Sequence, residues 1–230
     1  MSNDTSAITQ IDLATMNFEV AFQGPKPNSQ YAPDMPNHLW IAEQHAEQWR
    51  PVAGGTSPMR DDVVGNLDNL TELQQIFNML FPQLTSELAS ILKGDTSQIS
   101  PFNTHLAQLG QQIGYRIDDA TKAKSEIDAF YGLIAGDVAA VGGDKQLLQA
   151  HSDTSALSGL QSFYTSLSRA SSSVLTLRNG LDSIADDLNN MRDDLDRIKA
   201  PNALADLYLP VVNAKYQSMI TLVNQLSVDE

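Results

Sequence analysis

Histidines and carboxylates are the residues of this 230-residue chain whose types and spacing could bind a metal ion or move a proton. His38 and His45 lie seven residues apart, with Glu43 and Glu47 nearby. On a helix, seven residues make two turns, which is too far for a shared metal ion without a third element. No H-E-x-x-H pair is present either. We therefore expect no metal site and interpret these side chains as a solvated polar face.

A run of aspartates near residue 190 could bind calcium if it formed a turn. Its members are Asp182, Asp186, Asp187, Asp193, Asp194 and Asp196. Calcium loops place their ligands at alternating positions around a turn-forming glycine. These aspartates instead alternate with an apolar stripe and with Arg192, Arg197 and Lys199. The run predicts the solvated face of a helix, and an acidic partner-binding face is the alternative.

Sequence templates for enzymatic catalysis are missing. There is no G-x-S-x-G motif, and Gly142-Gly143-Asp144-Lys145 has neither the spacing nor the Ser or Thr of a phosphate-binding loop. Cysteine is absent, which excludes disulfides, cysteine-ligated zinc and thiol catalysis. We expect no enzymatic activity, no cofactor and no small-molecule substrate.

The charge balance restricts the partners and the location of the chain. The 14 Lys and Arg residues against 28 Asp and Glu residues give a net charge of −14, without a basic cluster that could neutralise nucleic acid. No stretch approaches the roughly 20 apolar residues of a membrane-spanning helix. Residues 1–10 contain no basic residue and no apolar run of the signal-peptide type. Composition leaves the compartment open; a protein that is secreted without a conventional signal peptide, or cytoplasmic before release, fits this N-terminus.

The segment with the most unusual composition is 129–143, A-F-Y-G-L-I-A-G-D-V-A-A-V-G-G, whose one charge is Asp137. Gly132 and Gly136 form a G-x-x-x-G motif, which permits close helix approach in lipid or in a packed bundle. One interpretation is a tightly packed helical hairpin whose small residues let two backbones touch. The other is a concealed apolar tip that enters a membrane, with Asp137 on its tolerated polar side.

The membrane interpretation makes this segment one end of the bundle, hidden against residues 11–22 before release. About 15 residues fall short of the roughly 20 needed to span a bilayer alone, so the tip would need oligomers. Its membrane-interacting residues are Phe130, Tyr131, Gly132, Leu133, Ile134, Ala135, Gly136, Val138 and Val141.

The first 60 residues predict an irregular segment, because six of the ten prolines lie between residues 25 and 58. Within it, Asn37 to Arg50 predicts one short helix, capped by Asn37 and stopped by Pro51. Residues 11–22 mix apolar side chains in partial alternation, which fits a strand or a short helix. The even-numbered apolar run from Met16 to Phe22 favours a short strand.

Residues 61–230 predict a bundle of long helices, because apolar residues repeat there every three or four positions. Pro82 predicts a kink in the first helix, and Pro210 predicts an interruption in the last. The predicted helices run from 61 to Gly94, from Ser100 to Gly143, from 153 to 199 and from 202 to 228.

The third of these helices carries a coiled-coil heptad, because its apolar steps alternate between three and four from Val174 onward. We expect this seam to be available to partner helices, and its residues are Leu181, Ile184, Leu188, Met191, Leu195 and Ile198. At about 1.5 Å per residue, the second and third helices would each be roughly 60 to 70 Å long. The sequence therefore predicts an all-α, elongated antiparallel bundle whose two longest helices join between Gly142 and Ser152.

These features together resemble the α-helical pore-forming toxins over residues 61–228. The features are the long heptad helices, the Gly/Ala-rich apolar stretch at a helix reversal, the absence of cysteine, and a tail of the type R-N-G-L-D-S-I-A-D-D-L-N-N-M-R-D-D-L-D-R-I. That group includes cytolysin A, haemolysin BL, the non-haemolytic enterotoxins and the motility-associated killing factor proteins.

The resemblance implies an accessory or partner subunit of a multi-protein pore-forming cytotoxin. Its partners would be other protein subunits of the same toxin system and a target membrane. The alternative is a non-toxic coiled-coil interaction or structural protein, such as a secretion-system, chaperone or scaffold component.

Overall fold

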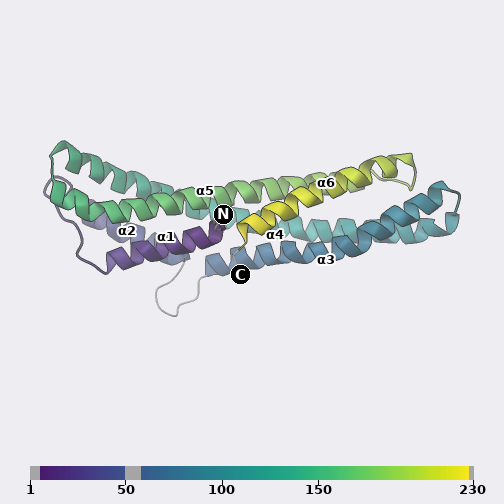
Figure 1. The fold of residues 1–230 in the computed structure, drawn as a ribbon, viewed down its shortest axis with the longest axis horizontal. Helices are drawn as coiled ribbons and strands as arrows, with labels where there is room; N and C mark the ends of the chain where they lie inside the picture. The colour runs from purple at the N-terminus through teal and green to yellow at the C-terminus, as the bar shows by residue number, and fades with distance from the viewer. Residues whose placement is uncertain (1–5, 50–57, 228–230) are drawn as a thin grey trace, which may run out of the picture. The chain divides into compact units, whose positions relative to one another are not determined.

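A computed structural model describes residues 6–49 and 58–227, and every regular element in these ranges is helical, which confirms the predicted all-α class. The predicted helix ends at Arg50, Pro51 and Val228 lie outside these ranges. The helices are α1 (Ala7–Phe22), α2 (Met35–Trp49), α3 (Pro58–Leu92), α4 (Ile99–Ala150), α5 (Thr154–Asp196) and α6 (Ala203–Leu226), with a short 3-10 helix at Thr96–Gln98 (Figure 1).

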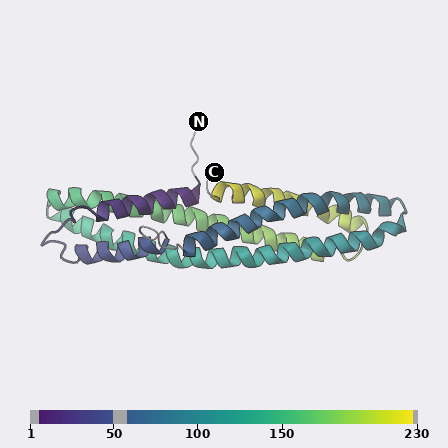
Figure 2. The same ribbon diagram turned by 90° about the horizontal axis from the view of Figure 1, so that it is seen from below.

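The chain packs as two compact units, and α4 and α5 contribute to both. Unit 1 contains the described residues up to 64, together with 125–179 and 226–227. In it, α1 and α2 lie along α4 and α5 (Figures 1 and 2). Unit 2 contains residues 65–124 and 180–225, and there α3 and α6 lie along the remaining parts of the two long helices. The sequence-based boundary near residue 60 stays a prediction.

Helix α1 stands where the alternating pattern predicts a strand, so that prediction was wrong. The Oγ of Ser6 accepts a hydrogen bond at 3.2 Å from a backbone N–H of the first turn, which caps the helix. Ile11 and Phe18 are buried at helical spacing, whereas Met16 and Val20 are exposed. The even-numbered apolar run therefore covers two sides of a helix rather than one face of a strand.

Helix α6 continues through Pro210, so the predicted interruption there was also wrong. Proline removes one backbone donor and disfavours a helix interior. The side chains on either side, Leu209 and Val212, are both buried in unit 2. Their packing outweighs the local preference of proline. Helix α3 continues through Pro82, as predicted, and the kink expected there stays a prediction.

The turn after α3 is closed by Gly94, as predicted, with a φ of 104°. Its N–H donates to the carbonyl of Ile91 at 2.9 Å, and the N–H of Asp95 donates to the carbonyl of Ser90 at 3.1 Å. This is the Schellman arrangement, in which glycine adopts the left-handed conformation that side chains disfavour.

Replacing Gly94 with alanine should lower the free energy of unfolding by about 1 to 2 kcal/mol, because a Cβ is strained at this φ. Gly65 is the matched control, since nothing lies within 4 Å of a Cβ added there. Gly65→Ala should raise the free energy of unfolding by about 0.5 to 1 kcal/mol, as expected inside a helix. Urea unfolding measures both, and equal shifts of the two variants would contradict the left-handed turn.

Candidate functional site

The apolar segment 129–143 lies inside α4 rather than at its end. The helix continues through Gly142 and Gly143 to Ala150, so the helix end predicted at these glycines was wrong. Glycine weakens a helix by about 1 kcal/mol but does not end it where the flanking turns are packed. Val141 and Leu148, on either side, are both fully buried.

The chain reverses after Ala150 through a short polar turn that the segment before α2 holds in place. The Oγ of Ser29 donates to the Oδ2 of Asp153 at 2.6 Å, and the Tyr31 ring stacks on the ring of His151 with 4.3 Å between centroids. The hydrogen bond from Ser29, with one from a backbone N–H of α5, lowers the pKa of Asp153. The end of this hairpin is therefore hydrogen-bonded and polar, and the apolar residues lie further back along α4.

The inner side of the apolar segment is sealed within unit 1. Phe130, Ile134 and Val141 are fully buried. The Trp49 ring of α2 stacks on Phe130 with 5.4 Å between centroids. Both α1 and α2 cover the segment, and the sequence predicted only the first of these. The buried cluster around Val141 contains Phe18, Ala32, Met35, Leu39, Ala42, Ala46, Leu148, Ala156, Leu160, Phe163 and Leu167.

The outer side of the segment presents small residues to solvent. Gly132, Gly136 and Gly143 are exposed, and nothing lies within 4 Å of a Cβ added at any of them. The interpretation in which these glycines let two backbones touch is therefore wrong for this fold. Ala139 is exposed on the same side. The remaining predicted tip residues, Tyr131, Leu133, Ala135 and Val138, are half-buried.

Two His–Asp pairs join α2 to this part of α4. The Nδ1 of His38 lies 2.8 Å from the Oδ2 of Asp144, and the Nδ1 of His45 lies 2.9 Å from the Oδ2 of Asp137. A step of seven residues forward on α2 matches a step of seven back on α4, as antiparallel helices require. Because an ionised carboxylate only accepts hydrogen bonds, each Nδ1 carries the donated proton.

Both carboxylates are buried, and the two histidines, which the sequence predicts on a solvated polar face, are half-buried against them. Asp137 and Asp144 expose 4% and 3% of their surface. The side chains of His38 and His45 keep 30% and 20% exposure. A buried carboxylate is costly without a hydrogen-bond donor, and the histidines supply one to each. Sequence reasoning missed Asp144 altogether, although the equal spacing of the two histidines and the two aspartates was a usable signal.

Burial raises the pKa of Asp137, and the hydrogen bond and charge of His45 offset this only in part. Burial likewise raises the pKa of Asp144, which His38 lowers in part and the negative charge of Asp34 raises further. A carboxyl with a raised pKa binds its proton more tightly in the folded state than in the unfolded state. Each buried aspartate therefore contributes its full stabilisation at pH values below 3.8, the ordinary pKa of aspartate. This stabilisation is lost as pH rises through the raised pKa.

We expect the double variant Asp137→Asn, Asp144→Asn to lack this pH dependence. The difference in free energy of unfolding, wild type minus variant, should fall steadily as pH rises from about 4 towards neutrality. Urea unfolding of both proteins at a series of pH values measures this difference. The contributions of the other carboxylates cancel in it, because both proteins contain them. A difference that stays constant, or increases with pH, would contradict the raised pKa values.

The heptad seam predicted to bind partner helices lies inside unit 2. Its six members are buried, at 0% to 5% exposure: Leu181, Ile184, Leu188, Met191, Leu195 and Ile198. The heptad register is thus confirmed as a buried stripe. The chain's own helices occupy the seam in this structure, so its binding to another subunit stays a prediction.

The acidic run on α5 is partly solvated, as predicted. Asp186, Asp193 and Asp196 are exposed. Asp194 is an exception, because it is buried and accepts a hydrogen bond from the Nη1 of Arg197 at 3.0 Å.

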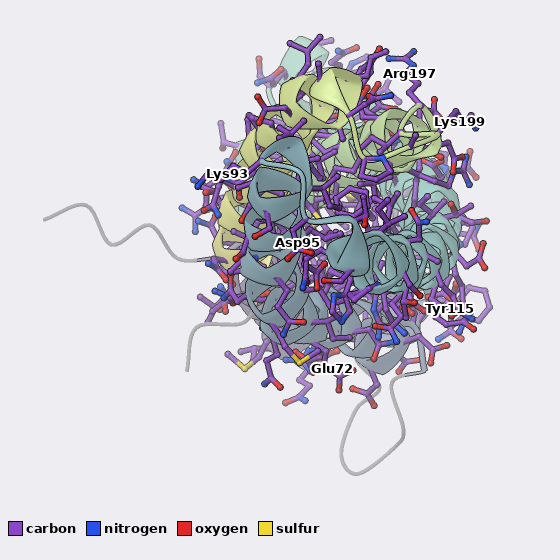
Figure 3. All side chains as sticks on the ribbon, turned by 90° about the vertical axis from the view of Figure 1, so that its right-hand side faces the viewer. Glu72, Lys93, Asp95, Tyr115, Arg197 and Lys199 are labelled. Carbon is purple, nitrogen blue, oxygen red and sulfur yellow. The ribbon has the colours of Figure 1, made fainter. Side chains whose placement is uncertain are left out.

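Several positively charged side chains lie at the end of unit 2, but they do not form one binding site. Lys93 lies at the α3–α4 turn, and Arg197 and Lys199 lie at the α5–α6 turn (Figure 3). The labels of Lys93 on one side and of Arg197 and Lys199 on the other lie apart in this view. We therefore identify no anion-binding cluster here.

Searches for a metal site and for a membrane span were negative over residues 6–49 and 58–227. No three His, Asp or Glu side chains gather there in a group that could hold a metal ion. No helix in those ranges has both the length and the hydropathy required to cross a membrane.

No protein-family model matches this chain, and no curated protein matches it at a significant level. The functional assignment therefore depends on the two sides of the α4 segment.

Proposed function

We propose that the chain is an accessory or partner subunit of a multi-protein α-helical pore-forming cytotoxin, here in its concealed form. In this proposal α4 and α5 are the spine of an elongated bundle, and segment 129–143 meets the membrane and the neighbouring subunits. The observation that carries the proposal is the row of exposed glycines in the middle of α4, for which unit 1 provides no packing role.

Glycine in a helix interior costs about 0.5 to 1 kcal/mol relative to alanine. Gly132, Gly136 and Gly143, with Ala139, follow one side of α4 at helical spacing and are all exposed. A smooth strip of small residues lets helices approach closely in lipid, where van der Waals packing drives their association. The strip therefore suits helix contacts that this unit does not make by itself.

The opposite side of the same helix supplies the apolar surface. Phe130, Ile134 and Val141 are buried beneath α1 and α2 in the concealed form. Release of this side would bring large apolar side chains to a lipid surface while the small strip remains free for a second helix. Because about 20 apolar residues are needed to span a bilayer, several subunits must act together.

Replacing Gly132 and Gly136 tests the proposal, because the substitution should raise stability and lower membrane activity. Gly132→Ala, Gly136→Ala should raise the free energy of unfolding by about 1 to 2 kcal/mol in total. The same variant should release less dye from liposomes, with or without the proteins of neighbouring genes, and should form fewer cross-linked oligomers. The control Gly110→Ala, Gly114→Ala lies on α4 in unit 2, where added Cβ atoms also meet nothing within 4 Å.

The control variant should gain similar stability and keep the wild-type dye release. Gly136→Lys adds a second test, because this exposed position accepts the side chain in the folded form. A lysine in hydrocarbon costs about 2.5 kcal/mol or more, so this variant should melt normally and lose membrane activity. Wild-type protein that neither binds nor permeabilises liposomes, alone or with the neighbouring proteins, would contradict the proposal.

A non-toxic interaction or structural protein is the second candidate, favoured by a different surface. Leu204, Leu207 and Val211 are all exposed at the start of α6, at helical spacing. An exposed apolar stripe of this kind suits a partner helix in a secretion-system, chaperone or scaffold component. Under this candidate, the glycine variants gain stability and cause no change in any liposome assay.

A further inference from the structure

We propose that α2 is a proton-dependent clasp on the apolar segment of α4, which tightens as its two His–Asp pairs take up protons and loosens as they lose them. The clasp goes beyond the proposed function and does not depend on it. It is a property of unit 1 alone and can be measured without a membrane.

The two pairs connect the same two helices at two levels. His38 lies in the first turn of α2 and His45 in its last two turns, and each reaches a buried carboxylate of α4. Between these levels α2 buries Leu39 and Ala42 in the cluster that surrounds Val141. The imidazoles remain partly exposed, so protons can reach them from solvent while α2 is docked.

The charge of each pair sets the direction of the effect. A neutral imidazole with an ionised carboxylate carries one net negative charge, whereas the same pair with one more proton carries none. A buried site disfavours net charge, and in the released state both groups are hydrated. The docked state therefore binds protons more tightly than the released state, and docking must strengthen as pH falls.

The groups around the aspartates do not provide a substitute for the imidazoles. Asp137 interacts with His45, and Asp144 interacts with His38 and with the negative charge of Asp34. Asp34 therefore adds to the unfavourable charge at the first pair.

Other charged side chains of unit 1 are directed to other partners. From α5, Arg178 forms an ion pair with Asp128, also on α4. Arg169 of α5 lines a hollow with α1. Lys145 of α4 lies over the Tyr164 ring at 4.4 Å, and Lys26, before α2, lies over the Phe22 ring at 4.1 Å.

The carboxylates of α2 itself add to the negative charge of this face. Burial raises the pKa of Glu43, the negative charge of Glu47 raises it further, and Lys26 partly opposes both. These negative charges favour the protonated form of each pair, so they act in the same direction as burial.

Amide hydrogen exchange of the full-length protein, without lipid, tests the clasp. Protection factors, corrected for the intrinsic exchange rate at each pH, report the opening of each helix separately. From about pH 5.5 to 8.5 we expect protection of residues 38–48 to fall roughly 10- to 100-fold, because each unit of pKa difference between the two states changes the equilibrium tenfold. Protection in α6 should change much less.

Four variants make the test specific. Asp137→Asn, Asp144→Asn keeps a hydrogen-bond acceptor for each Nδ1–H and removes the buried negative charge, so α2 protection should no longer fall as pH rises. Each single variant should lose about half of the pH-dependent change in the logarithm of the α2 protection factor. The single variants therefore still test the proposal if the double variant does not fold. The control His105→Gln removes a similar pair in unit 2, where the Nδ1 of His105 lies 2.9 Å from the Oε1 of Glu87, and should leave the α2 profile unchanged.

The clasp is overturned if α2 protection in the wild type is constant or increases with pH. It is also overturned if the Asn variants retain the wild-type pH dependence. Loss of liposome activity in the glycine variants bears on the proposed function and not on this exchange profile, so the two proposals can fail separately.

Discussion

Truncation of Leu188 or Leu195 to alanine is expected to lower the free energy of unfolding by about 2 to 5 kcal/mol. Leu188 is fully buried and Leu195 is 4% exposed, and both belong to the heptad stripe inside unit 2. Deleting a buried isobutyl group removes its transfer free energy and leaves a cavity, which a bundle of packed helices closes only in part.

The matched variant on the same helix is Asp187→Ala, one residue before Leu188 and outside the stripe. It should change the free energy of unfolding by less than about 0.5 kcal/mol, as surface substitutions usually do. Urea unfolding followed by circular dichroism compares the three variants with the wild type. Similar midpoints for all three would show that the heptad register is misplaced.

Replacement of His45 with alanine is expected to lower the free energy of unfolding by about 3 kcal/mol at neutral pH, because it leaves Asp137 buried without its donor. The double variant His45→Ala, Asp137→Ala should lose less than His45→Ala alone, since no charge then remains in the core. This non-additivity distinguishes a buried pair from a simple loss of packing volume.

The control for this cycle is His151→Ala. His151 stacks on Tyr31 in the hairpin turn, and its side chain is exposed. Its removal should cost less than about 1 kcal/mol, which is typical of an exposed position. If the effects of His45→Ala and Asp137→Ala on the free energy of unfolding simply add, His45 does not stabilise the buried Asp137.

At several positions, the packing of the helices outweighs the local conformational preference of the residue. Gly142 and Gly143 predicted a helix end and Pro210 predicted an interruption, yet α4 and α6 run through them. Each of these residues disfavours a helix by a few kcal/mol at most. Burial of side chains such as Val141 and Leu209 on neighbouring turns stabilises the helix by a comparable amount or more.

The alternating pattern near the N-terminus failed for a related reason. Met16, Phe18 and Val20 fit a two-residue period, but Ile11 and Phe18 fit the helical period equally well. Over so short a segment the two periods differ at few positions. The neighbouring helices decided between them, since only the helical face buries Phe18 against Phe163 of α5.

The helices of residues 61–227, the buried heptad stripe of α5 and the turn at Gly94 could be predicted from the sequence, because each depends on a period or a backbone preference within a few residues. The buried side of segment 129–143 and the carboxylates that contact the histidines depend on how the helices pack. His45 and Asp137 are 92 residues apart, and His38 and Asp144 are 106 apart. No local pattern specifies a partner at that distance; the antiparallel register of α2 on α4 does, because it brings both pairs into contact at once.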